Sequence, residues 1–111
     1  MDSLYDRFAH ARKLRGFTQS ELAEAAYVTR GVITNIEANR KMPQMPYLVL
    51  FAQILNVNLD WLLDGTGPME PDNERSKILN ELYKVCATLT EPQQKYILET
   101  IRIMQELLND D

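Results

Sequence analysis

The stretch TRGVITNIEANR, residues 29–40, carries two kinds of side chain at helical spacing. At about 100° per residue, the branched apolar residues Val32, Ile33 and Ile36 fall on one side of a helix. The opposite side holds small or polar residues, namely Arg30, Gly31, Thr34, Asn35 and Ala38. Guanidinium and carboxamide groups can each form two hydrogen bonds with one planar partner, and small residues let that partner approach the helix closely.

The edges of nucleobases in the major groove of DNA are planar partners of this kind. Arg30 can pair with guanine O6 and N7, and Asn35 with adenine N6 and N7, each pair giving roughly 1–3 kcal/mol of discrimination. Gly31, Thr34 and Ala38 would allow a close fit, and the Thr34 methyl group can meet a thymine methyl group. An ordinary solvated face would carry longer helix formers such as Glu, Lys and Gln. The pattern is typical of a DNA-reading helix; the alternative is a face that is merely exposed or packs on another protein.

The preceding residues supply the elements that would hold this face in place. Ser3 is a predicted N-cap for a helix that reaches Arg15. TQSE at 18–21 is a capping box, which predicts a second helix ending near Ala26. Thr29 is the natural N-cap of the next helix, so only two residues separate the second and third helices. Three helices joined in this way are typical of a helix-turn-helix.

The rest of the chain is also predicted to be helical. A mostly buried helix ends near Asn56, and Asn58 caps a short helix, with Trp61 in the core, that stops at Gly65. Prolines and the absence of periodicity predict a linker afterwards. The prediction is an all-α chain with a DNA-binding domain over residues 1–65, a linker over 66–73 and a two-helix oligomerisation extension over 74–111.

The last two helices, expected over residues 74–89 and 91–109, have wide apolar faces. A two-helix unit of this size is too small to bury a core by itself. We therefore expect its excess apolar surface to pack against another copy, in a homodimer or higher homo-oligomer; the alternative is packing back onto residues 1–64. The predicted oligomer interface comprises Tyr96, Ile97, Ile101, Ile103, Met104, Leu107 and Leu108.

The charge distribution favours a phosphate-bearing partner for the first part of the chain. The formal net charge of the whole chain is -4, which taken alone argues weakly against a nucleic acid. Residues 7–41 nevertheless hold seven Lys/Arg and three Asp/Glu, whereas residues 65–111 hold five against nine. The local positive surplus is modest but suffices to attract phosphates.

The sequence argues against an enzyme, a cofactor and a metal site. It has no phosphate loop and no nucleophile paired with a histidine base. One cysteine, Cys86, and one histidine, His10, exclude a Cys/His zinc site and an intramolecular disulfide. We expect Cys86 to be a buried small apolar residue and His10 to be exposed. The apolar run 47–52 is too short to span a bilayer and the N-terminus lacks signal-peptide features, so we expect no membrane partner and a location in the bacterial cytoplasm or nucleoid.

The segment TQSELAEAAYVTRGVITNIEANRKMP, followed by VNLDWLLDG, resembles the lambdoid phage repressor and Cro type of helix-turn-helix transcriptional regulator. The match covers residues 4–65 and implies a five-helix lambda-repressor-like domain with its third helix in the major groove. The positions that match base contacts are Arg30, Gly31, Thr34 and Asn35. The expected phosphate contacts are Gln19, Thr29, Asn39, Arg40 and Lys41.

The resemblance also implies an ion pair between Arg12 and Glu37, which would join the first helix to the end of the third. Removing one partner of such a partly buried pair costs about 3–5 kcal/mol. Two positions depart from the family: Tyr27 stands in the turn and Asn39 after the third helix, where glycine is usual. Asn tolerates a left-handed backbone well, whereas Tyr27 implies either strain or a locally different turn.

These observations predict a sequence-specific regulator, a short prophage-type repressor that binds a palindromic operator as a dimer. Residues 66–111 are too few for the self-cleaving module of larger phage repressors, so release would need a bound protein such as an antirepressor. One alternative is an antitoxin-like module that sequesters a partner through its C-terminal helices and autoregulates by binding DNA. Another is a restriction-modification controller, although such proteins tend to be shorter.

Overall fold

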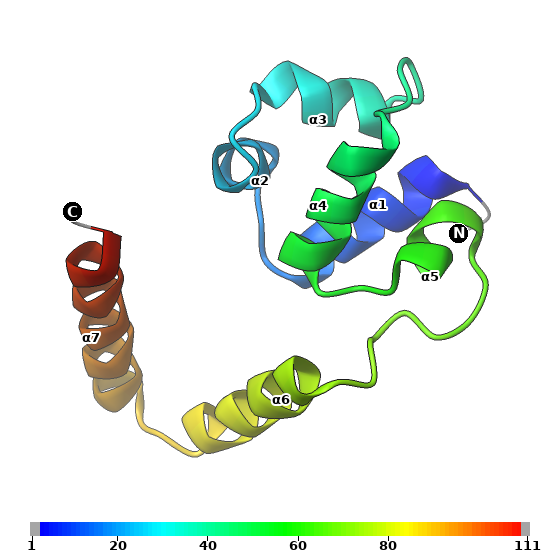
Figure 1. The fold of residues 1–111 in the computed structure, drawn as a ribbon. Helices are drawn as coiled ribbons and strands as arrows, with labels where there is room; N and C mark the ends of the chain where they lie inside the picture. Colours follow the sequence, from blue (N-terminus) through cyan, green and yellow to red (C-terminus); the bar gives the residue numbers. More distant parts are fainter. Residues whose placement is uncertain (1–2, 110–111) are drawn as a thin grey trace. The chain divides into compact units, whose positions relative to one another are not determined.

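The computed structural model describes residues 3–109, which form two compact all-α units. The boundary between the units in the chain falls between Asp72 and Asn73. The helices of the first unit are α1 (Leu4–Leu14), α2 (Gln19–Ala25), α3 (Arg30–Glu37), α4 (Met45–Leu55) and α5 (Leu59–Asp64) (Figure 1). The helices of the second unit are α6 (Glu74–Ala87) and α7 (Glu91–Asn109). Among the described residues, no helix combines the length and the apolar character that crossing a membrane requires.

Local capping decides where several of these helices begin. The Ser3 hydroxyl accepts a hydrogen bond from the Asp6 amide at the start of α1. Ahead of α2, the Glu21 amide donates to Thr18 Oγ1 over 3.0 Å and the Thr18 amide donates to Glu21 Oε1 over 2.9 Å. This is the capping box predicted from TQSE, and it satisfies backbone donors that a helix start leaves without partners. Thr29 occupies the N-cap position of α3 but makes no side-chain capping bond.

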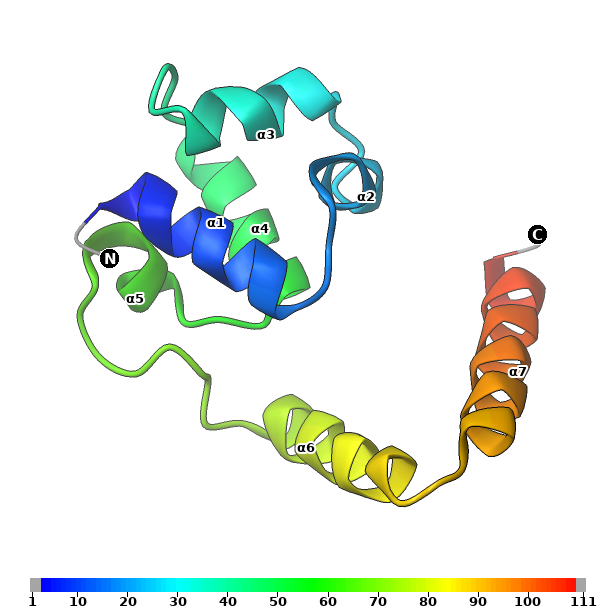
Figure 2. The ribbon, with the colours of Figure 1, turned by 180° about the vertical axis from the view of Figure 1, so that it is seen from behind.

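The core of the first unit is built from one apolar stripe of each helix. Phe8 of α1 and Phe51 of α4 meet edge to face, with their ring centroids 5.2 Å apart and both side chains fully buried. Leu22, Ile33 and Leu62 add α2, α3 and α5 to the same cluster. Trp61, expected in the core, is half-buried and packs against it. Helix α3 packs on α1 and α2 and lies along one edge of the unit, as Figures 1 and 2 show from opposite sides.

Arg7 of α1 and Arg15, the C-cap residue of α1, bind the C-terminal ends of other helices. Arg15 donates from Nε to the Leu55 carbonyl over 2.8 Å and from Nη2 to the Asn56 carbonyl over 3.0 Å. In the same way, Arg7 donates to the carbonyls of Leu62 and Leu63 at the end of α5. Terminal carbonyls have no partner within their own helix, so these long side chains fix α4 and α5 against α1.

The segment predicted as a linker, residues 66–73, belongs largely to the first unit, so the boundary lies later than the expected residue 65. The backbone N–H of Asn58 donates to the Met69 carbonyl over 2.8 Å, and the side-chain Nδ2 of Asn58 donates to the Pro68 carbonyl over 2.8 Å. Met69 packs against the core, and Glu70 pairs with Arg15. Prolines and glycines prevent a helix here, but they do not prevent an irregular segment from docking through one apolar side chain and its backbone carbonyls.

The second unit leaves most of its apolar side chains uncovered. None of the residues of α7 is buried, and Ile97 is the one apolar side chain of that helix that reaches half-burial. Cys86, expected to be buried, is also half-buried, because α6 and α7 share little surface that could cover it. A hydrogen bond of 2.8 Å from Gln94 Nε2 to the Cys86 carbonyl links the two helices.

Candidate nucleic-acid interface

The face of α3 singled out by its sequence lies on the outside of the first unit. Ile33 and Ile36 are buried, whereas the opposite side of the helix is open to solvent to different degrees. Arg30, Gly31 and Ala38 are exposed, and Thr34 and Asn35 are half-buried. The structure therefore brings the four predicted base-contacting residues, Arg30, Gly31, Thr34 and Asn35, onto one accessible surface.

Gly31 is not required by the packing of the protein itself. A Cβ atom at this position would meet only the Thr29 hydroxyl oxygen, at an ordinary contact distance of 3.8 Å. Its backbone has no positive φ angle, so a larger residue would not be strained there. The helix nevertheless carries the stability cost of glycine, about 1 kcal/mol or less relative to alanine near a helix start. A bare surface for an approaching partner is a physical reason for keeping it.

An ion pair anchors α3 to α1. Arg12 Nε lies 2.6 Å from Glu37 Oε2, and Arg12 Nη2 donates to Glu37 Oε1 over 3.0 Å. The third nitrogen, Nη1, donates to the Phe17 carbonyl over 2.7 Å. The two side chains are only 9% and 11% exposed, so the pair is shielded from water. Three charge-assisted hydrogen bonds thus tie α1, the loop before α2 and the end of α3 to one another.

Gln19 extends this network to the outer face of α3. Its Nε2 donates to Glu37 Oε1 over 3.2 Å, while its Oε1 lies 3.3 Å from the Thr34 hydroxyl. The Thr34 hydroxyl also lies 3.2 Å from the Arg30 carbonyl. The sequence predicts Gln19 as a phosphate contact. It does not predict the hydrogen bonds to Glu37 and Thr34, because these residues lie 18 and 15 positions along the chain and meet Gln19 only after folding.

A basic basin lies beside the start of α3. It is an open hollow of about 670 Å³ and is lined by Arg12, Lys13, Gly16, Phe17, Thr18, Gln19, Ser20 and Arg30. The charge of Arg12 is balanced by Glu37, so Lys13 and Arg30 supply the remaining positive charge. Thr18 and Ser20 add hydroxyl groups. Lys13 and Ser20, which are not among the contact residues predicted from the sequence, also line this hollow.

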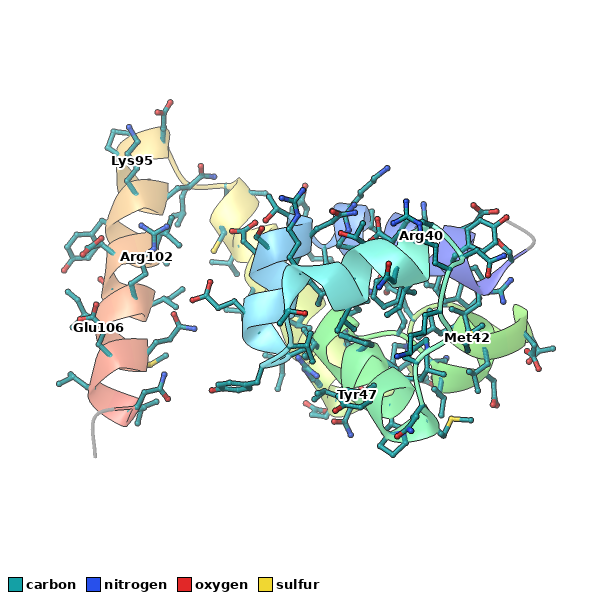
Figure 3. The ribbon with its side chains drawn as sticks, turned by 90° about the horizontal axis from the view of Figure 1, so that it is seen from above. Arg40, Met42, Tyr47, Lys95, Arg102 and Glu106 are labelled. Carbon is teal, nitrogen blue, oxygen red and sulfur yellow. The ribbon has the colours of Figure 1, made fainter. Side chains whose placement is uncertain are left out.

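The other end of α3 carries a second group of polar and basic residues. Asn39, Arg40 and Lys41 are all exposed, and Figure 3 shows Arg40 just beyond the end of the helix. Asn39 has a left-handed backbone, with φ 55°, and the Arg40 amide donates to the Asn35 carbonyl over 2.8 Å. This tight closure directs the chain out of the helix. Lys41 and Asn35 also line a hollow of about 390 Å³ together with Met42 and Tyr47.

Tyr27 stands in the turn between α2 and α3 with φ 57°, and its side chain is 96% exposed. The turn therefore has the left-handed geometry that a glycine would take, and tyrosine accepts the strain, which is roughly 1–2 kcal/mol for an L-residue. Of the two possibilities that the sequence raised, strain is the one observed.

A family model described as Helix-turn-helix matches residues 9–62. The HTH-type transcriptional regulator SinR of Bacillus subtilis (strain 168) is 30% identical over 83 residues, which cover 74% of this chain and 75% of that protein. The chain belongs to the helix-turn-helix family of transcriptional regulators. The family predicted from residues 4–65 is confirmed, and so is its non-enzymatic class.

Solved structures of this helix-turn-helix family share the fold. SinR in complex with DNA is 34% identical with a TM-score of 0.53, over 55% of this chain and 98% of that chain. The P22 c2 repressor, bound to a synthetic operator, has a TM-score of 0.56 at 23% identity over 59% of this chain and 98% of its own, which supports the lambda-repressor-like fold.

The SinR/SinI complex gives a match that extends beyond the first unit. It covers 93% of this chain and 98% of that chain, with 25% identity and a TM-score of 0.54. The all-α architecture with C-terminal helices is therefore shared with SinR. Another helix-turn-helix relative, the regulator for conjugative element R391 of Providencia rettgeri, is 37% identical over 67 residues. These residues make up 60% of this chain, which spans only 31% of that relative.

Proposed function

We propose that this protein regulates transcription by binding a specific operator in double-stranded DNA with α3 in the major groove. The observation that carries the proposal is the outer face of α3, which presents side chains that are either small or polar. On the inner face, Ile33 and Ile36 are buried in the core and anchor the helix. Membership of the helix-turn-helix family and the SinR structure solved in complex with DNA support it. A helix with a bare outer face fits a groove about 12 Å wide.

Within this proposal, Arg30, Gly31, Thr34 and Asn35 meet the base edges. Arg30 provides a forked donor for guanine, and Asn35 provides one donor and one acceptor for adenine. The backbone carbonyl of Asn35 accepts the Arg40 amide, which fixes the backbone at this position, and the half-buried side chain has less freedom than a fully exposed one. A defined side chain loses less conformational freedom on binding than a mobile one, which favours specific contacts.

The phosphate contacts fall on both sides of α3. On one side, Gln19 keeps a second Nε2–H beyond the one given to Glu37, and the Thr29 hydroxyl is not used for capping. Lys13 and Ser20, which line the basic basin, join these two. On the other side, the exposed residues Asn39, Arg40 and Lys41 contact the phosphate backbone of the DNA. Such contacts position the protein on the duplex and give salt-dependent affinity without specifying sequence.

We also propose that α7, with help from α6, joins two copies of the chain. Its apolar side chains are exposed along the full helix, from Tyr96 (72%) through Ile101 (41%) to Leu108 (73%). The predicted interface residues Tyr96, Ile101, Ile103, Met104, Leu107 and Leu108 are exposed, as is Leu98, whereas Ile97 is half-buried. A helix of 19 residues is about 28 Å long, enough to form much of a standard interface when two copies pack together.

A dimer of this kind would place two copies of α3 on two half-sites related by a two-fold axis. Half-sites about one helical turn apart, roughly 34–36 Å, are the spacing that such dimers read. The operator is therefore expected to be palindromic, and the protein to work as a prophage-type repressor in the bacterial cytoplasm or nucleoid. SinR is known in a complex with SinI, which supports release by a protein partner such as an antirepressor.

A second candidate function is an antitoxin-like module whose exposed α7 binds an unrelated protein and whose DNA binding only autoregulates. The observation that favours it is the same uncovered helix, because a heterologous partner can bury α7 as well as a second copy can. The two functions differ in the purified state. A protein that purifies alone as a homodimer supports the repressor, and a stoichiometric co-purifying protein supports the antitoxin.

The experiment that tests the proposed function is selection of bound duplexes from random DNA followed by sequencing, with Asn35→Ala as the variant. The wild type is expected to select a two-fold symmetric site, and Asn35→Ala to relax one position in each half-site while the salt dependence stays nearly unchanged. Arg40→Ala is the matched variant, expected to weaken binding uniformly and to reduce the salt slope by about one. Binding that shows no sequence preference would contradict the proposal.

A further inference from the structure

The Thr34 hydroxyl has one hydrogen and two acceptors within the protein. It lies 3.3 Å from Gln19 Oε1 and 3.2 Å from the Arg30 carbonyl, and both of these atoms accept hydrogen bonds. Whichever of the two receives the hydrogen, the outward side of the Thr34 oxygen presents only lone pairs. Toward a ligand, Thr34 therefore acts as an acceptor and not as a donor.

The orientation of the Gln19 amide follows from its other neighbour. Gln19 Nε2 donates to Glu37 Oε1 over 3.2 Å, and the Glu37 carboxylate is charged and paired with Arg12. Turning the amide over would bring its oxygen against a carboxylate oxygen, where neither atom has a hydrogen to donate. The buried Arg12–Glu37 pair thus fixes Gln19 Oε1 on the side of Thr34.

We propose that Thr34 selects a base that carries an exocyclic amino group in the major groove, adenine through N6 or cytosine through N4. At the same position it disfavours guanine and thymine, whose O6 and O4 atoms are acceptors. To donate to such a carbonyl, the hydroxyl would first have to give up its acceptors within the protein. This inference rests on the proposed function, because it assigns a chemical preference to one residue of the same DNA-reading face.

The test compares the sites selected from random DNA by the wild type, Thr34→Val and Thr34→Ser. Valine keeps the branched shape and replaces the oxygen by a methyl group, while serine keeps the oxygen and loses the methyl group. The wild type and Thr34→Ser are expected to prefer adenine or cytosine at one position of each half-site, by roughly tenfold. Thr34→Val is expected to lose that preference and to keep the others.

A change in the DNA gives the same test without altering the protein. In the selected site, the preferred adenine is replaced by purine, or the preferred cytosine by 2-pyrimidinone, each of which lacks the exocyclic amino group. The wild type should bind the altered site roughly tenfold more weakly, whereas Thr34→Val should bind both sites equally. The far-ultraviolet circular dichroism and urea midpoint of each variant verify that it is folded.

Two results would overturn the inference while leaving the proposed function intact. In the first, the wild type selects guanine or thymine at the position that Thr34→Val relaxes, which would mean that Thr34 donates. In the second, Thr34→Val changes no position, or removal of the amino group leaves wild-type affinity unchanged. A wild type that selects no sequence at all would instead remove the proposed function together with this inference.

Discussion

Both units of the chain contain amphipathic helices, but the apolar faces are buried in the first unit and exposed in the second. In the first unit Phe8, Phe51 and Ile33 are fully buried, because five short helices cover one another. In the second unit α7 buries none of its residues, although apolar side chains recur along it at helical spacing. Periodicity thus indicates that a helix has an apolar face, but not which molecule covers that face. Under the proposed function, the closed unit reads DNA and the open one provides the surface for assembly.

The largest effect is expected from opening the closed core. Phe51→Ala removes a fully buried ring that meets Phe8 edge to face, and should lower the free energy of unfolding by about 3–5 kcal/mol. Leu14→Ala is the matched control, because Leu14 lies in the same unit but is 56% exposed; its effect should be about 0.5 kcal/mol. Urea denaturation monitored by circular dichroism measures both. Equal losses would mean that the first unit has no discrete core.

The next effect concerns the ion pair that holds α3. Glu37→Ala leaves the nearly buried guanidinium of Arg12 without its carboxylate and should cost about 3 kcal/mol of unfolding free energy. Glu24→Ala, an exposed carboxylate on α2, should cost less than about 0.5 kcal/mol. The comparison is made by urea denaturation at two salt concentrations. If the two variants were equally stable, the pair would not anchor α3.

A smaller effect is expected on assembly. Ile101→Asp places a charge on the apolar face of α7 and should weaken self-association by about 2 kcal/mol, or roughly thirtyfold in Kd, without unfolding the first unit. Arg102→Glu is the control, since Lys95, Arg102 and Glu106 follow one another along the polar part of α7 (Figure 3), and it should change the Kd little. Sedimentation equilibrium measures the Kd. If the Ile101→Asp protein self-associated with the wild-type Kd, the apolar face of α7 would not be the interface between copies.

The smallest effect concerns the turn before α3. Tyr27→Gly should raise the free energy of unfolding by about 0.5–1 kcal/mol, because glycine adopts φ 57° without strain and the tyrosine side chain is almost fully exposed. Asn39→Gly should raise it less, since asparagine tolerates this conformation better. Thermal denaturation distinguishes the two. A loss of stability in Tyr27→Gly would mean that the tyrosine makes a contact that offsets its strain.

What the sequence predicts well here depends on neighbours along the chain. The TQSE capping box and the limits of most helices follow from residues within one or two turns, whereas the left-handed residue at Asn39 was implied by the family resemblance. The Gln19–Thr34 contact, the capping of α4 and α5 by Arg15 and Arg7, and the docking of Met69 join distant residues. Their formation depends on how the helices pack, which local patterns do not specify. The Arg12–Glu37 pair was anticipated through the family resemblance, because no spacing rule links residues 25 positions apart.

The central claim, that the closed unit reads DNA and the open unit pairs two copies, is tested most directly by DNA titration. Wild-type protein, Ile101→Asp and Arg102→Glu are titrated with the selected palindrome and with an isolated half-site at one salt concentration. Linking two reading units raises the apparent affinity. Because Ile101→Asp weakens self-association roughly thirtyfold, it should lose up to roughly thirtyfold on the palindrome and almost nothing on the half-site. Arg102→Glu should match the wild type on both. Equal losses on the two DNAs, or none on the palindrome, would contradict the division of roles.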